Sequence, residues 1–436
     1  MNTEAALDEE LHRPHAPLNP GRRLSALLQT GRFRGHPLSN PAYVRLLAST
    51  LFAYAARFLD MTMLSWLVVQ RTVDPLPVAL LSFFRFVPFL AGGPLFGLLA
   101  DRLPRLRLIR GAQTGLVVLA LSMAVLLWTD SLQLWHIYVY ALCQGALFIL
   151  DSMSRRSYMA GTVGASHVTV ALSVDMLGST VTRILFSNAA GALLDASSPR
   201  WGYLLLAAFP IMAIWMTRGL PTLFAQDSTR EPFLTSVRGG LAFARANRLV
   251  LGGLLLVALS NLTGFVYEPM VAAVADEVYH ATPILFGMFL SATGVGSLAT
   301  TLWLILRSRR ISQPGWIGLL AMAGMHLAQI GFSYSTTVVN ALAALAACGA
   351  AGMLFSIAHS NLFLVATPDD LRGRVLGLQA LMIGTFPLSN LLVGWLGNHV
   401  GPLVAVRYIA LAGMVWVVAM GVLVPELRQK VEDEST

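Results

Sequence analysis

The stretch that decides the fold is GLLADRLPRLR, residues 97–107, which stands between two long apolar segments. Gly97 offers a small surface on which another helix can approach closely. Asp101 lies at the boundary of helix and turn, where its carboxylate can pair with an arginine or with the positively polarised N-terminus of a neighbouring helix. Arg102 and Arg105 make the turn basic, which favours the cytoplasmic side of a membrane. We predict that these four residues form a latch between conformational states; the alternative is an ordinary basic loop.

The composition around this stretch is that of a membrane protein. Apolar residues make up 56% of the 436 residues and charged residues only 12%, which leaves too little polar surface to cover a water-soluble globule of this size. The apolar runs are continuous, whereas a β-barrel would show short alternating segments. Over such lengths in lipid, only an α-helix forms hydrogen bonds to all of its own backbone N–H and C=O groups. We therefore predict an all-α membrane protein.

Twelve apolar runs separated by turns or charges predict twelve transmembrane helices, because one span uses about 20 mostly apolar residues. We place them at residues 43–70, 77–100, 108–129, 133–154, 167–193, 201–217, 249–275, 284–306, 314–333, 338–365, 374–397 and 404–424.

The basic residues are divided unequally between the two sides of these helices. Arginines gather in every second connection, whereas the intervening connections hold only Arg71, Arg200 and Arg407. Because basic loops stay in the cytoplasm, both termini are predicted to be cytoplasmic. We expect the protein to lie in the cytoplasmic (inner) membrane of a bacterium.

The longest internal break, at about residues 218–248, separates six spans from six. It predicts two pseudo-symmetric six-helix bundles, at 43–217 and 249–424, flanked by a flexible cytoplasmic arm at 1–42 and a cytoplasmic tail at 425–436. The arm does not have the pattern of a secretory signal. Within the break, apolar residues recur at near-helical spacing beside arginines, which is typical of an amphipathic helix on the inner membrane face; an ordinary basic connector is the alternative.

The residue inventory argues against several classes of function. Lys430 is the only lysine, so a Gly-Lys-Ser/Thr loop for nucleotide phosphates is absent and a self-contained P-loop pump is excluded. Cys143 and Cys348 lie in apolar segments, where we expect them to pack between helices. We predict no metal site, no cofactor and no nucleic-acid partner. The motifs of a hydrolytic enzyme are also missing, so we do not expect an enzyme.

Six plus six spans with this basic turn after the second span resemble the major facilitator superfamily. Its signature at this place is Gly-x-Leu-Ala-Asp-Arg followed by Gly-Arg-Arg/Lys. Gly97, Asp101, Arg102 and Arg105 match the signature, whereas Pro104 stands where the family usually has glycine. The resemblance implies a secondary transporter that moves a small molecule through a midplane cavity by alternating access.

The chain resembles more closely the transmembrane secretion effector branch, which includes the enterobactin exporter. The resemblance rests on NPAYVRLL at 40–47, FRFVP at 84–88, the amphipathic segment before Asn247-Arg248, and TPDDLRGRV at 367–375. It has two departures. Phe186-Ser187 stands where exporters often have Gly-Pro in the fifth span, and the second-half copy of the signature loop has no aspartate among its arginines at 307–310.

Charged residues inside the first two spans need a partner, a cavity or a function, because a charge at the bilayer centre costs roughly 2.5–3.5 kcal/mol on insertion scales. Arg57 and Asp60 lie three residues apart on one helix and can neutralise each other. Asp60 then either takes up a proton or a cationic group when Arg57 moves away, or stays in a fixed structural pair. Arg85 can meet an anionic substrate or the aspartate of the first span, or it can only lock helices together.

Span five carries a polar stripe. The stripe consists of Asp175, Ser179 and Thr182, and Arg183 follows directly after Thr182. These polar side chains face either the interior or a neighbouring helix. Asp151 stands near the end of span four, and we expect it to be solvated or to cap a helix.

In the second half, Asn261 and Glu268 precede Pro269 and predict a kinked, polar-lined seventh span, with Glu268 in gating or proton transfer. His359 has Asn361 nearby and can either titrate near neutral pH or serve only in packing.

The resemblance and these residues together predict a proton-coupled exporter of a small amphipathic molecule, such as a siderophore, a metabolite or a drug. Its partners would be this substrate, protons and the lipid bilayer, and we expect it to function as a monomer. The alternative in the same class is an importer or uniporter of a small solute. From a different class, a non-transporting receptor or scaffold remains open.

Overall fold

The computed structural model describes residues 37–72, 74–164, 167–222, 233–307 and 312–429, with the backbone alone described at 90–102, 233–234, 236, 307 and 369–370. Every regular element in these ranges is a helix or a helical turn, and none is a strand. The all-α prediction is therefore confirmed.

Six helices form the N-terminal half: α3 (Pro41–Val69), α4 (Pro75–Arg102), α5 (Arg105–Trp128), α6 (Leu134–Val163), α7 (Val168–Ala196) and α8 (Pro199–Met216). A separate helix, α9 (Phe233–Ala246), follows. The C-terminal half consists of α10 (Arg248–Leu259), the π-turn η3 (Ser260–Gly264), α11 (Tyr267–Glu277), α12 (Pro283–Arg307), α13 (Pro314–Ser333), α14 (Val338–Ala366), α15 (Asp369–Ile383), α16 (Phe386–Val400) and α17 (Pro402–Leu423). Short 3-10 turns flank the bundle at η1 (Pro37–Ser39) and η4 (Pro425–Arg428).

Ten helical segments of the described chain are long and apolar enough to cross a membrane, with α10–α11 and α15–α16 each counted as one segment. The other two predicted spans correspond to α4 and α8. In the described part of α4, the apolar stretch covers only Pro75–Phe89, and α8 has 18 residues. The prediction of twelve spans is thus confirmed for ten of them.

Local sequence explains where several helices begin. Asn40 accepts a hydrogen bond from the backbone N–H of Ala42, and Asn247 accepts one from Val250, so both asparagines are N-caps. Proline stands in the first turn of α3, α8, α13 and α17, where its missing N–H would have no helical partner. Gly401, with φ of +84°, makes the turn into α17.

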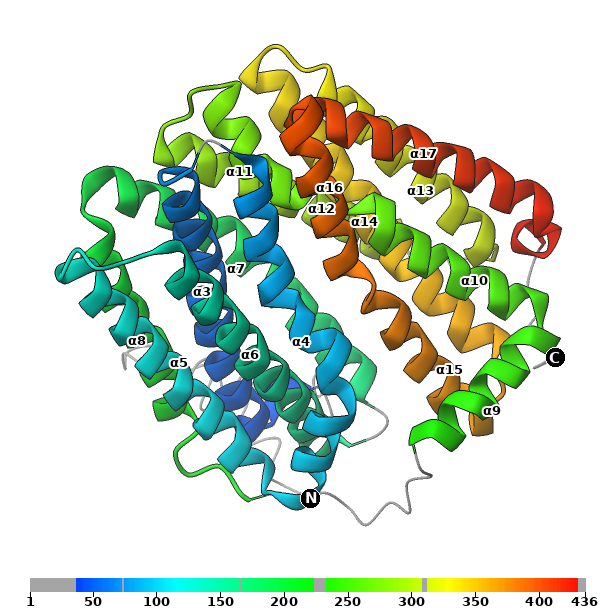
Figure 1. Ribbon diagram of the computed structural model, residues 1–436. Coiled ribbons are helices and arrows are strands. Elements are labelled where there is room, and N and C mark those ends of the chain that lie inside the picture. Colours follow the sequence, from blue (N-terminus) through cyan, green and yellow to red (C-terminus); the bar gives the residue numbers. More distant parts are fainter. Residues whose placement is uncertain (1–36, 73, 165–166, 223–232, 308–311, 430–436) are drawn as a thin grey trace, which may run out of the picture.

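The two halves touch at one end and diverge at the other. In Figure 1 the N-terminal half (blue to green) and the C-terminal half (bright green to red) meet near α11 and α16 and separate toward α9 and α15. The main contacts pair α7 with α12 and α4 with α16. The backbone N–H of Leu76 donates to Asn398 Oδ1 at 3.2 Å, which joins the halves at the end predicted to face outside. The bundles are therefore closed at that end.

Glycines allow α7 and α12 to cross closely between the halves. A Cβ at Gly191 on α7 would lie 2.5 Å from the carbonyl oxygen of Pro283, and a Cβ at Gly287 on α12 would lie 2.6 Å from the carbonyl oxygen of Ser187. Any larger side chain would force these backbones apart. The position where exporters of the family often have proline is thus occupied here by a serine whose carbonyl faces a glycine of the other half.

The seventh span is broken earlier than the sequence suggests. We predicted a kink caused by Pro269, but the helix is interrupted at the π-turn Ser260–Gly264, and Pro269 lies in the first turn of α11. Proline is tolerated there because the first N–H groups of a helix have no intrahelical partner. Asn261 Nδ2 donates to the carbonyl of Val257 at 2.8 Å within the break.

The helix α9 packs against α15. Its apolar residues Val237, Leu241, Phe243 and Ala244 contact the hydrophobic core that α10, α13 and α14 share. Arginines Arg238 and Arg245 lie on its exposed side. This segment is an amphipathic helix attached to the C-terminal half.

Candidate functional site

A buried ion pair lies in the centre of the N-terminal bundle. Arg85 on α4 places Nη2 3.2 Å from Asp60 Oδ2 on α3, and Tyr140 on α6 donates its hydroxyl to Asp60 Oδ1 at 2.7 Å. Asp60 and Arg85 expose only 2% and 5% of their surfaces. Removing one partner of such a pair leaves an unpaired buried charge, at a cost of about 3–5 kcal/mol. The pair is therefore a strong constraint on the relative positions of α3 and α4.

Arg57 does not neutralise Asp60, although the two are three residues apart. Its guanidinium Cζ lies 3.4 Å from the ring centroid of Phe148 on α6, a cation–π contact. Arg85 takes the aspartate instead, at a level where α4 and α6 approach closely: a Cβ at Gly145 would lie 2.0 Å from the carbonyl oxygen of Arg85. The prediction that Arg85 can meet the aspartate of the first span agrees with this geometry.

The central cavity lies between the two bundles and has a volume of about 630 Å³, including space open to solvent. Aromatic rings from both halves form much of its wall, and Arg85, Arg183 and Glu268 supply its charges. The rings are Phe86, Tyr267, Phe286, Phe289 and Phe386. Such a wall can hold a molecule with an apolar body and a polar or charged group.

The two bundles are joined by an ion pair at this cavity. Arg183 Nη2 on α7 lies 3.1 Å from Glu268 Oε1 on α11. Both side chains are about one quarter exposed, at 29% and 28%. A substrate in the cavity can reach both groups, since both form part of its wall.

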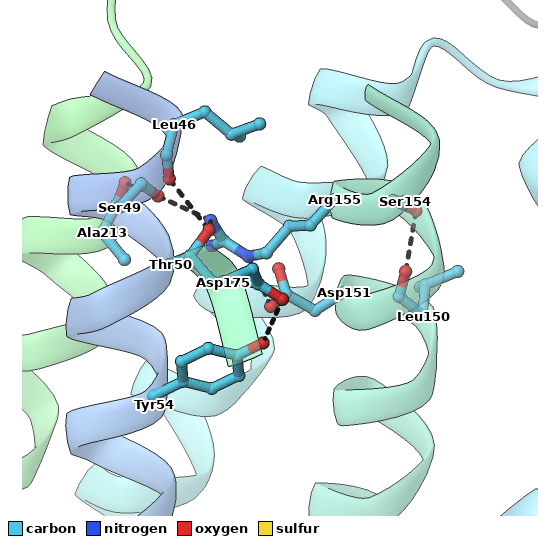
Figure 2. A network of polar contacts seen from close by, with 10 residues as sticks. All are labelled: Leu46, Ser49, Thr50, Tyr54, Leu150, Asp151, Ser154, Arg155, Asp175 and Ala213. Atoms are coloured by element: carbon cyan, nitrogen blue, oxygen red, sulfur yellow. Dashed lines mark hydrogen bonds and ion pairs between the residues drawn. The ribbon is translucent and has the colours of Figure 1, made fainter. Parts of the chain in front are cut away.

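A second polar network lies nearer the predicted cytoplasmic ends of α3, α6 and α7 (Figure 2). Arg155 donates to Asp151 Oδ2 at 2.7 Å, and it also donates to Ser49 at 2.9 Å and to Thr50 at 3.3 Å. Asp151 exposes only 3% of its surface, so our expectation of a solvated or capping aspartate is wrong. The i, i+4 spacing of Asp151 and Arg155 places both on one helix face, where they pair.

Asp175 belongs to the same region. Its Oδ2 accepts a hydrogen bond from Tyr54 of α3 at 3.0 Å, and Figure 2 shows it beside Asp151. The aspartate of the polar stripe therefore faces a neighbouring helix, not the central cavity. Arg183, eight residues further along α7, is the member of this helix that reaches the cavity.

The predicted polar residues of the C-terminal half are distributed among separate places. Asn261 is buried in the π-turn. His359 is partly buried between the rings of Phe355 and Phe363, with centroid distances of 4.8 and 6.3 Å, and Asn361 is also partly buried. The described wall of the central cavity includes none of Asn261, His359 and Asn361.

The signature loop is described only in part. Gly97, Asp101 and Arg102 belong to the last turns of α4, and their side chains lie outside the described residues. Arg105 begins α5 and donates to the carbonyl oxygen of Ser157 on α6 at 3.0 Å. Pro104 precedes α5, and its carbonyl oxygen accepts a hydrogen bond from the N–H of Arg107 at 2.8 Å. Proline can fill this position because the position needs a carbonyl acceptor and no backbone N–H.

Several polar residues around these sites were missed by sequence reasoning. The ion pair of Asp151 and Arg155 could have been found, because their i, i+4 spacing is a signal for such a pair. Gln113 on α5 and Tyr140 on α6 gave none, because one amide or phenol in an apolar run is compatible with many positions. The helix packing alone directs them toward Asp60 and Asp151.

Comparisons with known proteins agree with this architecture. A family model described as transmembrane secretion effector matches residues 34–435. An uncharacterised MFS-type transporter, YfiS of Bacillus subtilis, is 25% identical over 346 residues, which cover 76% of this chain and 81% of the relative. The enterobactin exporter EntS of Salmonella typhimurium is 26% identical over 333 residues, with 72% and 77% covered.

The fold is also that of a solved transporter. The crystal structure of a mutant nucleoside transporter NupG superposes with a TM-score of 0.64 at 14% identity, covering 89% of this chain and 100% of that one. At this identity the likeness concerns the fold alone. The family match extends over nearly the whole chain, so this protein belongs to the transmembrane secretion effector family of MFS-type transporters.

Proposed function

We propose that this transporter is a proton-coupled exporter of a small amphipathic molecule and works by alternating access. The observation that carries the proposal is the position of Arg85. Its guanidinium pairs with the buried Asp60, and the same side chain forms part of the central cavity wall. An anionic group that enters the cavity can compete for Arg85, so occupancy by substrate and the proton affinity of Asp60 are linked.

The conformation supports this mechanism. The bundles are in contact at the end predicted to face outside, so the cavity between them would receive its substrate from the cytoplasm. Substrate binding and reopening toward the outside would then expose Asp60 to the external proton concentration. Protonation of Asp60 releases Arg85 from its partner and favours the return of the empty transporter.

The chemistry of the cavity supports an amphipathic substrate. Aromatic walls favour an apolar body, and the partly exposed Arg183 and Glu268 can orient a polar group. The cavity is formed within one chain, which supports function as a monomer. Export as the direction rests on the relative named as an enterobactin exporter, which is a distant one at 26% identity.

Efflux measurements in a bacterial strain stripped of its own efflux systems test the proposal. Cells that express the chain should accumulate less of at least one compound from a panel of amphipathic dyes and catecholate siderophores. A protonophore should abolish the difference. Faster uptake in expressing cells would indicate an importer, and a difference that survives the protonophore would indicate a uniporter. No effect of expression across the panel would favour a receptor or scaffold.

A further inference from the structure

Two small cavities lie inside the N-terminal bundle, apart from the cavity between the bundles. The first is lined by Asp60, Gln113, Tyr140 and Asp151, among others. The second is lined by Tyr54, Asp151, Arg155, Arg156 and Asp175, among others. Both include Ala53, Phe148 and Asp151. Three buried carboxylates from three helices, α3, α6 and α7, therefore stand along one interior route.

Unpartnered polar atoms face this route. Gln113 is fully buried, and neither its Nε2 nor its Oε1 has a hydrogen-bond partner in the described part of the chain. The same is true of Asp151 Oδ1 and Asp175 Oδ1. Buried amides and carboxylates are nearly always hydrogen-bonded, and small polar cavities hold water that supplies the missing bonds. Water in the two cavities would satisfy all four atoms and link the carboxylates.

The route leads from the middle of the bundle toward its predicted cytoplasmic side. Tyr54, which donates to Asp175, precedes Asp60 by six residues on α3, a rise of about 9 Å along the helix. Asp175 lies in the third turn of α7, the helix that begins at Val168 near this side. Arg156, which lines the second cavity, is exposed. The second cavity is thus lined by a residue that is exposed at the surface, and the first is lined by Asp60.

We propose that these two cavities form a proton pathway in which Asp151 and Asp175 carry protons between Asp60 and the cytoplasm. The proposal rests on the proposed proton-coupled function and extends it to two residues outside the central cavity. A proton leaves the carboxyl oxygen of Asp60, crosses water beside Gln113 to the carboxylate of Asp151, and continues to Asp175. At each step one O–H bond breaks and another forms, one carboxyl gains a charge of −1 and the next loses it, and no electron is transferred.

Charged and polar groups from several helices surround each of the three carboxylates. Asp151 is held by Arg155, and Arg57 lines the cavity it shares with Asp60. Asp60 has Arg85, Tyr140 and the neighbouring Tyr203 around it. Asp175 faces Tyr54, with Arg155 and Arg156 in the same cavity, and the Tyr43 hydroxyl donates to the carbonyl of Ala171 one helical turn before Asp175. Arg155 also bonds to Ser49 and Thr50, so it retains partners when Asp151 is neutral.

A purely structural role would make a different experimental prediction. If Asp151 and its neighbours only locked α3, α6 and α7 together, then altering them would slow every movement of substrate. A proton pathway is needed only when protons move. Exchange of substrate across the membrane at equal pH on both sides separates the two roles.

The experiment uses the purified full chain in proteoliposomes, with ethidium as the probe. Gln113→Leu removes a water-binding amide, and Ala53→Leu fills the space shared by both cavities, neither with a change of charge. Each should reduce ethidium transport driven by a pH gradient about tenfold or more while changing exchange at equal pH by no more than about twofold. Asn390→Leu is the matched control, because Asn390 is also fully buried with both amide atoms unpartnered among the described residues, but lies on α16. It should preserve both activities.

A second readout needs no substrate. In a pH titration followed by infrared difference spectroscopy, the wild type should show carboxyl bands that disappear in Asp151→Asn or Asp175→Asn and return in Asp151→Glu. Absence of the bands of both Asp151 and Asp175 would overturn the pathway, regardless of the rate of ethidium transport. Gradient-driven transport that is unchanged in Gln113→Leu and Ala53→Leu would also overturn it, as would equal losses of transport and exchange. A wild type that shows the bands but moves no probe under a pH gradient would instead count against the proposed function.

Discussion

Arg183 and Glu268 form an ion pair between the two bundles, with 3.1 Å between guanidinium and carboxylate. Arg183 belongs to α7 of the N-terminal half and Glu268 to α11 of the C-terminal half. The proposed alternating access requires the halves to rock against each other, so under this proposal the contact breaks or rearranges in every transport cycle.

The first prediction concerns this pair. Arg183→Gln or Glu268→Gln should slow transport several-fold, since each removes an attraction that holds the outer end closed. For a partly exposed pair the coupling is about 1 kcal/mol or less, because water screens it. Reversing both charges, Arg183→Glu with Glu268→Arg, should recover much of the rate. Transport per molecule of protein measures this effect; a double reversal that is slower than either single variant would contradict it.

The second prediction concerns Asp60. Asp60→Asn should remove the pH dependence of transport and should also lower the amount of folded protein, because Arg85 is left buried and unpaired at a cost of about 3–5 kcal/mol. The double variant Asp60→Asn with Arg85→Gln removes both charges and should recover abundance without recovering pH dependence. Transport at several pH values, normalised to protein in the membrane, tests this. A pH profile identical to wild type would exclude Asp60 from coupling.

The third prediction concerns the signature loop. We expect Asp101→Asn to impair cycling more than folding, because the carboxylate is proposed to stabilise one conformational state and not the fold. Transport should fall while the protein remains at normal abundance and with a normal melting temperature. Asp101→Glu serves as the control that keeps the charge. Full activity of Asp101→Asn would show that the loop is an ordinary basic turn.

The fourth prediction concerns orientation in the membrane. In a background without Cys143 and Cys348, Thr336→Cys should react with a membrane-impermeant maleimide in intact cells, whereas Arg107→Cys should react only after the cells are opened. Both positions are exposed, so access to the side chain does not limit the reaction. The opposite labelling pattern would place the basic turns outside and invert our topology.

The fifth prediction concerns helix packing within the C-terminal half. A Cβ at Gly349 on α14 would lie 1.9 Å from the carbonyl oxygen of Thr293 on α12, so Gly349→Ala must separate these helices. Overpacking of this kind costs about 1–3 kcal/mol, and the melting temperature in detergent should fall. Gly331→Ala is the matched control, because no atom lies within 4 Å of its added Cβ. Equal melting temperatures for the two variants would show that the α12–α14 contact relaxes freely.

Much of the fold could be predicted from the sequence because hydropathy acts locally. Each apolar run has to hydrogen-bond its own backbone N–H and C=O groups in lipid, so it forms a helix. This requirement depends only on the residues of that run. Most predicted spans accordingly agree with the helices to within a few residues, whereas α6 continues to Val163, well past the end predicted at residue 154. The break in the seventh span was misplaced because Pro269 is an obvious signal, whereas the weak helix formers of the π-turn, Ser260, Asn261, Thr263 and Gly264, are a weaker one.

The candidate site depended on more than the sequence. The charged residues of the spans could be identified one by one, because a charge in an apolar run is costly wherever it lies. Their partners could not, because a helix offers several neighbours and its rotation is set by packing. Close contacts such as Gly145 against the backbone of Arg85 decide that rotation.

The sequence by itself therefore determined that this chain is a helical membrane protein, which residues its membrane segments contain and where its basic turns lie. Only the tertiary structure decided that Asp60 pairs with Arg85, that Asp151 and Asp175 share an interior route, and that Arg183 meets Glu268 across the bundles. The physical reason is that burial in lipid follows from composition along the chain, whereas an ion pair between helices follows from distances of a few ångströms that only the packed bundle fixes.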